Sequence, residues 1–141
     1  MNQNIDSKIF EGSCLCQAVK YRIESSPKAF YFCHCQQCRK LTGSAMATNI
    51  QLEIADINWL SGEDKINRFD HPGDRMFSKV FCKTCGSALP YVNENKTALV
   101  IPAGSLDSDL DIAPEVNIFW EDKASWYESG VNARCCEGFD E

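Results

Sequence analysis

The chain has 141 residues, 44% of them hydrophobic, which is the composition of a globular domain rather than of a disordered segment. Its formal net charge of −6 opposes binding to nucleic-acid backbones or anionic membranes, because those partners select for clustered Lys and Arg. No apolar run reaches the length of a membrane span, and the first residues lack the pattern of a secretion signal. We therefore expect a cytoplasmic protein.

The predicted elements are mostly short strands. Val19, Tyr21 and Ile23 alternate with polar neighbours, which is typical of a strand that buries one face. Further expected strands lie at 29–33, 45–50, 66–69, 76–81, 98–101 and 116–120. The expected helical turns lie at 36–41 and 123–128. The pattern predicts an all-β fold of short antiparallel strands with small irregular helical turns. We expect one domain over residues 1–141, with a core at about 10–128 and a polar tail at 129–141.

Nine cysteines are too many for an ordinary cytosolic domain, and seven of them are grouped at one- and two-residue spacings. In a reducing compartment such groups are metal ligands more often than disulfides. Zinc is the default ion for thiolate clusters of this kind, and an iron–sulfur cluster is the minority alternative.

The simplest partition of these cysteines starts with two pairs. Cys14 and Cys16 are two apart, so in an extended strand both sulfur atoms point to the same face. Cys82 and Cys85 form a C-x-x-C turn, and Gly86 permits the positive backbone angle that a tight knuckle often needs. The two pairs together predict a tetrahedral structural zinc site that joins distant segments of the chain.

Cys33, Cys35 and Cys38 remain as ligands of a second zinc ion. Three protein ligands leave one coordination position free, which is the usual difference between a catalytic and a structural zinc. A fourth protein ligand is the competing interpretation. His34 alternates to the opposite face, so we expect it to be exposed or to orient a ligand. The side chains that could close the site are His71, Cys135 and Cys136.

Three segments carry these cysteines: 12–16 (GSCLC), 33–44 (CHCQQCRKLTGS) and 81–87 (FCKTCGS). They resemble, in order and spacing, the motifs of the glutathione-dependent formaldehyde-activating enzyme family, which also includes centromere protein V. The resemblance runs from about residue 10 to about residue 128 and implies a β-tent fold with the two zinc sites described above. Family members often have a histidine before the final tryptophan segment, where this chain has Asn117-Ile118.

The resemblance also implies a zinc-dependent carbon–sulfur lyase or synthase. Such an enzyme handles a thiol–aldehyde adduct, for example S-(hydroxymethyl)glutathione from glutathione and formaldehyde. In this hypothesis the three-cysteine zinc is catalytic and binds the thiol as a thiolate. Candidates to contact the carboxylates of a peptide thiol are Arg39, Lys40, Arg68 and Arg75. Candidates to donate hydrogen bonds near the metal are Thr42 and Ser44.

Two other functions stay open at this point. A non-catalytic zinc-binding module would contact other proteins, and an exposed apolar patch or a second zinc closed by His71 would favour it. A zinc or thiol-stress buffer would release metal from the three-cysteine site on oxidation. Nucleic acid and membrane are not expected as partners.

Overall fold

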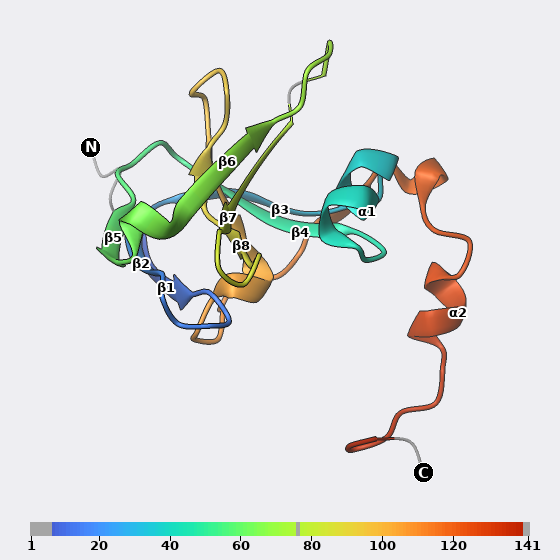
Figure 1. Ribbon diagram of the computed structural model, residues 1–141. Helices are drawn as coiled ribbons and strands as arrows, with labels where there is room; N and C mark the ends of the chain where they lie inside the picture. The colour runs from blue at the N-terminus through green and yellow to red at the C-terminus, as the bar shows by residue number, and fades with distance from the viewer. Residues whose placement is uncertain (1–6, 76, 140–141) are drawn as a thin grey trace.

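The strands form three β-sheets (Figure 1), and the computed structural model describes residues 7–75 and 77–139. The first sheet is antiparallel and has the order β1-β2-β5. Its strands are β1 (Lys8–Ser13), β2 (Lys20–Ser25) and β5 (Asn58–Ser61). In β2 the alternation predicted from Tyr21 and Ile23 is observed, since both side chains are buried.

The second sheet has five strands and is the largest. Its spatial order is β11 (Val116–Ile118), β3 (Pro27–Cys33), β4 (Ala47–Leu52), β10 (Leu99–Pro102) and β9 (Tyr91–Val92). Cys33, the last residue of β3, pairs with Ala47 on one side and with Ile118 on the other. The end of β3 is therefore held by two neighbouring strands.

The third sheet is antiparallel, and its strands are β6 (Ile66–Asp70), β7 (Ser78–Cys82) and β8 (Ala88–Leu89). Two α-helices are short, α1 (Gln36–Thr42) and α2 (Tyr127–Val131). Three 3₁₀ turns occupy Glu63–Lys65, Ala103–Ser105 and Trp120–Asp122. The prediction of a mostly β fold with few helical turns is confirmed.

The structure differs from the predicted elements in three respects. The β11–β3 pair is parallel, although only antiparallel pairs were predicted; the chain crosses over after β10 and enters the sheet edge in the direction of β3. Strands β1, β5, β8 and β9 were not predicted, and two of them have only two residues. The helix expected at 123–128 begins at Tyr127, because Lys123 has an extended backbone that ends the preceding turn. Position 76, the start of one expected strand, lies outside the described residues.

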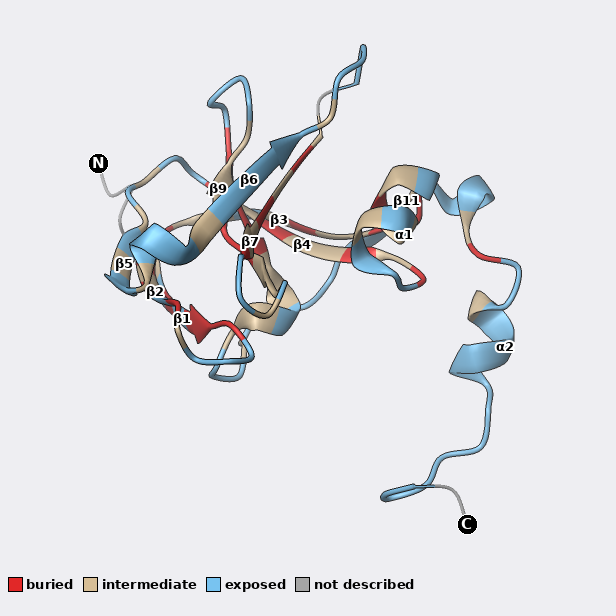
Figure 2. Cartoon of the chain, in the orientation of Figure 1, coloured by how far each residue is buried: buried red, intermediate tan, exposed pale blue. Residues whose placement is uncertain are grey.

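The hydrophobic core lies between the sheets and includes Val19, Tyr21, Ile50 and Leu99. The hydroxyl of Tyr21 is 2.6 Å from Ser105 Oγ, so this buried phenol has a hydrogen-bond partner. Figure 2 shows the buried segments in the sheets, whereas the chain beyond β11 is mostly exposed. Within the described residues, no helix is long and apolar enough to cross a membrane.

Candidate metal centres and the cavity between them

The first cysteine cluster joins the loop after β1 to the turn after β7. The sulfur atoms of Cys14, Cys16, Cys82 and Cys85 all lie within 4.8 Å of one another. Hydrogen bonds shape the loop that carries the first pair: Cys14 N donates to Val19 O at 3.0 Å. The structure thus brings together the four cysteines that the sequence spacing grouped.

The C-x-x-C turn has the backbone geometry of a tight knuckle. Gly86 N donates to Cys82 O at 2.8 Å, and Gly86 has a φ of 80°, the left-handed conformation that glycine adopts without strain. Ser87 Oγ lies 3.2 Å from Cys85 Sγ, and this hydrogen bond is the largest of several that together lower the pKa of Cys85 to about 5. Thr84 N donates to Cys82 Sγ at 3.4 Å. Backbone and side-chain donors therefore stabilise thiolate character at this turn.

The second cluster consists of Cys33, Cys35 and Cys38, whose sulfur atoms also lie within 4.8 Å of one another. Cys33 ends β3, Cys35 is the N-cap of α1, and Cys38 is the buried residue of that helix. Cys38 N donates to Cys35 Sγ at 3.3 Å, so the sulfur takes the place of the usual oxygen of a capping residue. All three side chains are buried, with exposures of 4%, 2% and 2%.

The electrostatics of this second cluster favour negative charge. A hydrogen bond from the Cys38 side chain is the main cause that lowers the pKa of Cys33 to about 5, and Arg75 contributes by its positive charge. The same bond raises the pKa of Cys38, because Cys38 is the donor. Arg75 Nη2 donates to Cys35 Sγ at 3.4 Å. The guanidinium also lies 4.1 Å from the centre of the Phe119 ring, a cation–π contact that fixes its position.

His34 is fully buried, so the prediction that it is exposed was wrong. Its ring packs edge-on against Trp120 and Tyr127, and its Nε2 lies 2.8 Å from Asn117 Oδ1. Strand alternation does turn it away from Cys33 and Cys35, but the C-terminal segment covers that face. His34 therefore anchors the chain after β11 to the end of β3.

The alternative fourth ligands do not join the second cluster. Among the described residues, the group of metal-ligating atoms contains the three cysteines alone. The ring of His71 lies next to Phe69, with 6.2 Å between ring centroids. Cys135 and Cys136 are exposed in the C-terminal segment, where Cys136 Sγ lies 3.1 Å from Arg134 Nη1.

The four-cysteine cluster passes a geometric test for zinc. Thiolates about 2.3 Å from a tetrahedral ion lie roughly 3.8 Å apart. The observed distances from Cys16 Sγ are 3.6 Å to Cys14 Sγ and 3.9 Å to Cys82 Sγ. Sulfur donors at this spacing could hold a metal ion in each cluster, and the chemistry of the donor set suits zinc.

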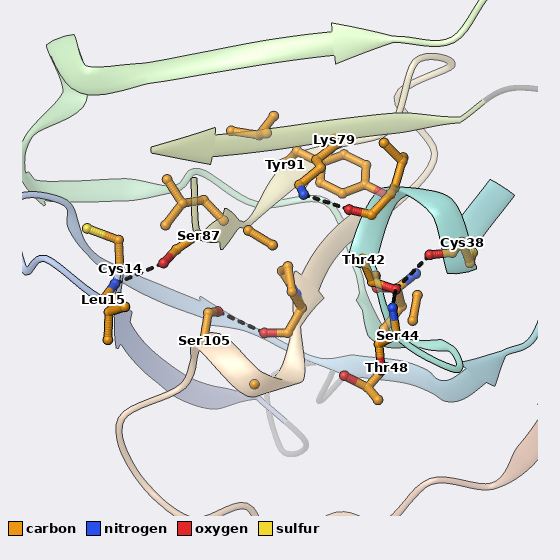
Figure 3. A pocket seen from close by; sticks show the side chains of 18 of the residues that line it. Cys14, Leu15, Cys38, Thr42, Ser44, Thr48, Lys79, Ser87, Tyr91 and Ser105 are labelled. Carbon is orange, nitrogen blue, oxygen red and sulfur yellow. Dashed lines mark hydrogen bonds between the residues drawn. The ribbon is translucent and has the colours of Figure 1, made fainter. Parts of the chain in front are cut away.

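A cavity of about 580 Å³ lies between the two clusters. Cys14 lines one side of it and Cys38 the other, and Figure 3 shows these two residues on opposite walls. The volume falls in the range of about 300–1,000 Å³ typical of small-molecule sites. Of the predicted substrate contacts, Thr42 and Ser44 line the cavity. Arg39, Lys40, Arg68 and Arg75 are not among the described residues that line it.

Several lining residues were not singled out from the sequence. The chief examples are Lys79, Tyr91, Ser105 and Asp107. None of them belongs to a cysteine motif, and they come from three different segments of the chain. Lys79 is in β7, between the buried Ser78 and Val80. This alternation is the only local signal in the sequence that could have indicated which way the Lys79 side chain points.

The fold and these sites define a β-rich protein with two cysteine clusters that could hold metal ions on either side of a small-molecule cavity. The model of the family described as "Glutathione-dependent formaldehyde-activating enzyme" matches residues 9–122. The chain belongs to this family.

Two curated proteins and one solved structure are similar to the chain. A Halomonas elongata protein named "Putative glutathione-dependent formaldehyde-activating enzyme" is 35% identical over 93% of this chain and 88% of its own length. A Schizosaccharomyces pombe protein named as an uncharacterized lyase is 22% identical over 84% of each chain. The crystal structure of a Rhodobacter sphaeroides protein aligns with a TM-score of 0.56 and 19% identity, over 76% of this chain and 97% of that chain, which shows a shared fold.

Proposed function

We propose that the protein is a zinc-dependent carbon–sulfur lyase or synthase. It forms or cleaves the adduct between a small-molecule thiol, such as glutathione, and a small aldehyde, such as formaldehyde. Family membership and the names of the two curated relatives support this class of reaction. The observation that carries the proposal is the buried three-cysteine cluster beside a cavity, with no fourth ligand among the described residues.

The two clusters have different roles in this proposal. Cys14, Cys16, Cys82 and Cys85 hold a structural zinc ion that ties β1 to β7, whereas Cys33, Cys35 and Cys38 hold a second ion beside the cavity. A zinc ion with three protein ligands supplies a Lewis acid that accepts a thiol sulfur and favours its deprotonated form.

Residues around the second cluster prepare it for this role. Burial of the three sulfur atoms excludes bulk water, and the Arg75 guanidinium offsets part of their negative charge. Thr42 Oγ1 donates to Cys38 O at 2.8 Å and accepts from Ser44 N at 3.2 Å. These bonds hold the end of α1 in place, so Thr42 positions the cysteine helix.

The test is the rate of exchange between free glutathione and S-(hydroxymethyl)glutathione, measured by NMR at matched pH and glutathione concentration. The zinc-loaded protein should accelerate the exchange, and the Cys35→Ser variant should lose the acceleration. The matched control is Cys136→Ser, which removes an exposed thiol outside both clusters and should leave the rate unchanged. Absence of acceleration by protein that carries two zinc ions would overturn the proposal.

One observation favours a second function, a protein-interaction module. The C-terminal segment exposes large apolar side chains, among them Trp126 at 57% and Val131 at 64%. Exposed apolar groups of this kind mark contact surfaces when they form a patch. A Trp126→Ser variant tests the second function: binding to a protein partner should be lost while the exchange rate stays unchanged, and binding that is retained would count against an interaction surface at this segment.

A further inference from the structure

The cavity contains very little charge. Among the described residues that line it, Lys79 is the sole cation and Asp107 the sole anion. The remaining lining is a mixture of hydroxyl, amide, thiol and apolar side chains. A carboxylate or ammonium group of a ligand inside the cavity therefore has these two side chains as its charged partners.

Lys79 is half-buried, and its ammonium group has capacity for a ligand. Its Nζ donates to Leu41 O at 2.8 Å, which uses one of three donor hydrogens. None of the ion pairs among the described residues includes Lys79. A half-buried cation without a carboxylate partner is costly unless an anion neutralises it.

The position of this ammonium group is next to the second cluster. Leu41 belongs to α1, the helix that carries Cys38, so the bond to Leu41 O holds Lys79 Nζ at the cysteine side of the cavity. Figure 3 shows Lys79 and Tyr91 on the wall that faces Thr42 and Cys38. A ligand whose sulfur approaches Cys38 therefore brings its nearby polar groups within reach of Lys79.

Asp107 lies toward the four-cysteine cluster, and its negative charge opposes the binding of an anion at that end of the cavity. Ser13 Oγ lies 3.0 Å and 2.8 Å from its two carboxylate oxygens, and Ser13 directly precedes Cys14. A carboxylate at this end of the cavity would be repelled. Among the described lining residues, Lys79 is thus the one side chain that would attract a carboxylate, and it contacts the helix that carries Cys38.

We propose that Lys79 is the specificity-determining residue that binds a carboxylate of the thiol carrier, so that the site selects small thiols with one carboxylate a few atoms from the sulfur. The inference rests on the proposed function for the identity of the ligand as a thiol. Lys79 takes the place of four candidates that the sequence indicated for this task and that are not among the described residues lining the cavity: Arg39, Lys40, Arg68 and Arg75.

The experiment measures binding of two thioethers of equal size to the zinc-loaded protein by NMR titration. The probes are 3-(methylthio)propanoate and its neutral amide, 3-(methylthio)propanamide. Neither has a free thiol, so neither forms an aldehyde adduct and the result does not depend on turnover. The wild-type protein should bind the carboxylate about tenfold more tightly, which is the size of one hydrogen-bonded charge contact.

The variants assign this preference to one side chain. Lys79→Gln should abolish it, and Lys79→Arg should retain most of it. Lys40→Gln is the matched control, because it removes an exposed lysine of α1 that lies outside the cavity lining, and the preference should persist. Since the Lys79–Leu41 bond also links β7 to α1, thermal unfolding and zinc content of each variant show that the fold is retained.

The outcomes separate this inference from the proposed function. Equal binding of the two probes by the wild-type protein, or a preference that survives in Lys79→Gln, would overturn the role of Lys79. Loss of the preference in Lys40→Gln would do the same. A clear preference without any glutathione exchange would leave Lys79 as a carboxylate-binding residue and would count against the lyase proposal alone.

Discussion

The four-cysteine and three-cysteine clusters use the same ligand atom in different surroundings. In the first, Cys14 and Cys82 are in the core, whereas Cys16 is exposed and Cys85 is half-buried. In the second, all three cysteines are buried, and their neighbours include Arg75 and the segment after β11. The first cluster connects two sheets, and the second connects the end of a strand to a helix and borders the cavity.

This difference suggests how one protein separates stability from reactivity. Four ligands that join segments far apart in the sequence lower the entropy of the unfolded chain most effectively when a metal closes the loop. Three ligands on a short local segment, β3 to α1, contribute less to folding but leave one side of the site accessible. The following predictions test this division.

The largest effect is expected for Cys82→Ser. Cys82 is fully buried in the core, and its loss would remove one of the four ligands that link β1 to β7. We expect the free energy of unfolding to fall by at least about 3 kcal/mol, because loss of a structural metal is one of the few severe effects of a single substitution. Urea unfolding at fixed zinc concentration measures it. Unfolding at the wild-type urea midpoint would contradict a structural role for this cluster.

The Cys35→Ser substitution should affect the three-cysteine cluster and leave the four-cysteine cluster intact. Serine is itself a good N-cap, so α1 should form, and we expect a loss of stability of about 1 kcal/mol together with one zinc ion per chain. Metal analysis by mass spectrometry and urea unfolding of the same sample measure both quantities. If this variant lost both zinc ions, or unfolded as readily as Cys82→Ser, the clusters would not be independent.

Gly12→Ala should destabilise the fold near the four-cysteine cluster by steric overlap. A Cβ atom at this position would collide with Ser105 O and with the hydroxyl of the buried Tyr21. Overpacking of this kind costs about 1–3 kcal/mol. Gly104→Ala is the control, because its Cβ atom would meet open space, and its melting temperature should stay near that of the wild type. Similar melting temperatures for the two variants would argue against the close packing of Gly12.

Arg75→Gln should give a change that is confined to the three-cysteine cluster. The substitution removes the bond to Cys35 Sγ and the contact with Phe119, so affinity for the second zinc ion should fall about tenfold. Competition with a chelator of known affinity measures this change. Arg22→Gln is the control, because Arg22 pairs with Glu11 at 3.5 Å on the surface. An equal loss in both variants would indicate a general effect of net charge.

Much of the site could be expected from local spacing. Residues two apart in extended chain share a face, and a C-x-x-C turn returns the second sulfur toward the first, so the grouping of the cysteines needs few long-range contacts. The helix at 36–41 and most of the strands were predicted for the same reason, because their periodicity is local. The glycine at position 86 likewise reveals its left-handed conformation through residue type alone.

Other features depended on contacts between distant segments. The burial of His34 comes from Trp120 and Tyr127, and strand alternation describes its direction but not what covers it. The parallel pairing of β11 with β3 likewise follows from a crossover of the chain rather than from the composition of either strand.

The amino-acid sequence by itself determined the family, the predominance of strands and the two groups of sulfur ligands, because these depend on residue type and short spacing. Only the tertiary structure decided which charged side chains line the cavity. Arg39 and Lys40 directly follow Cys38 in the sequence, yet the one cation among the described lining residues is Lys79, supplied by the β6-β7-β8 sheet. The physical reason is that a cavity is formed by the packing of several elements, and spacing within one segment carries no information about its neighbours.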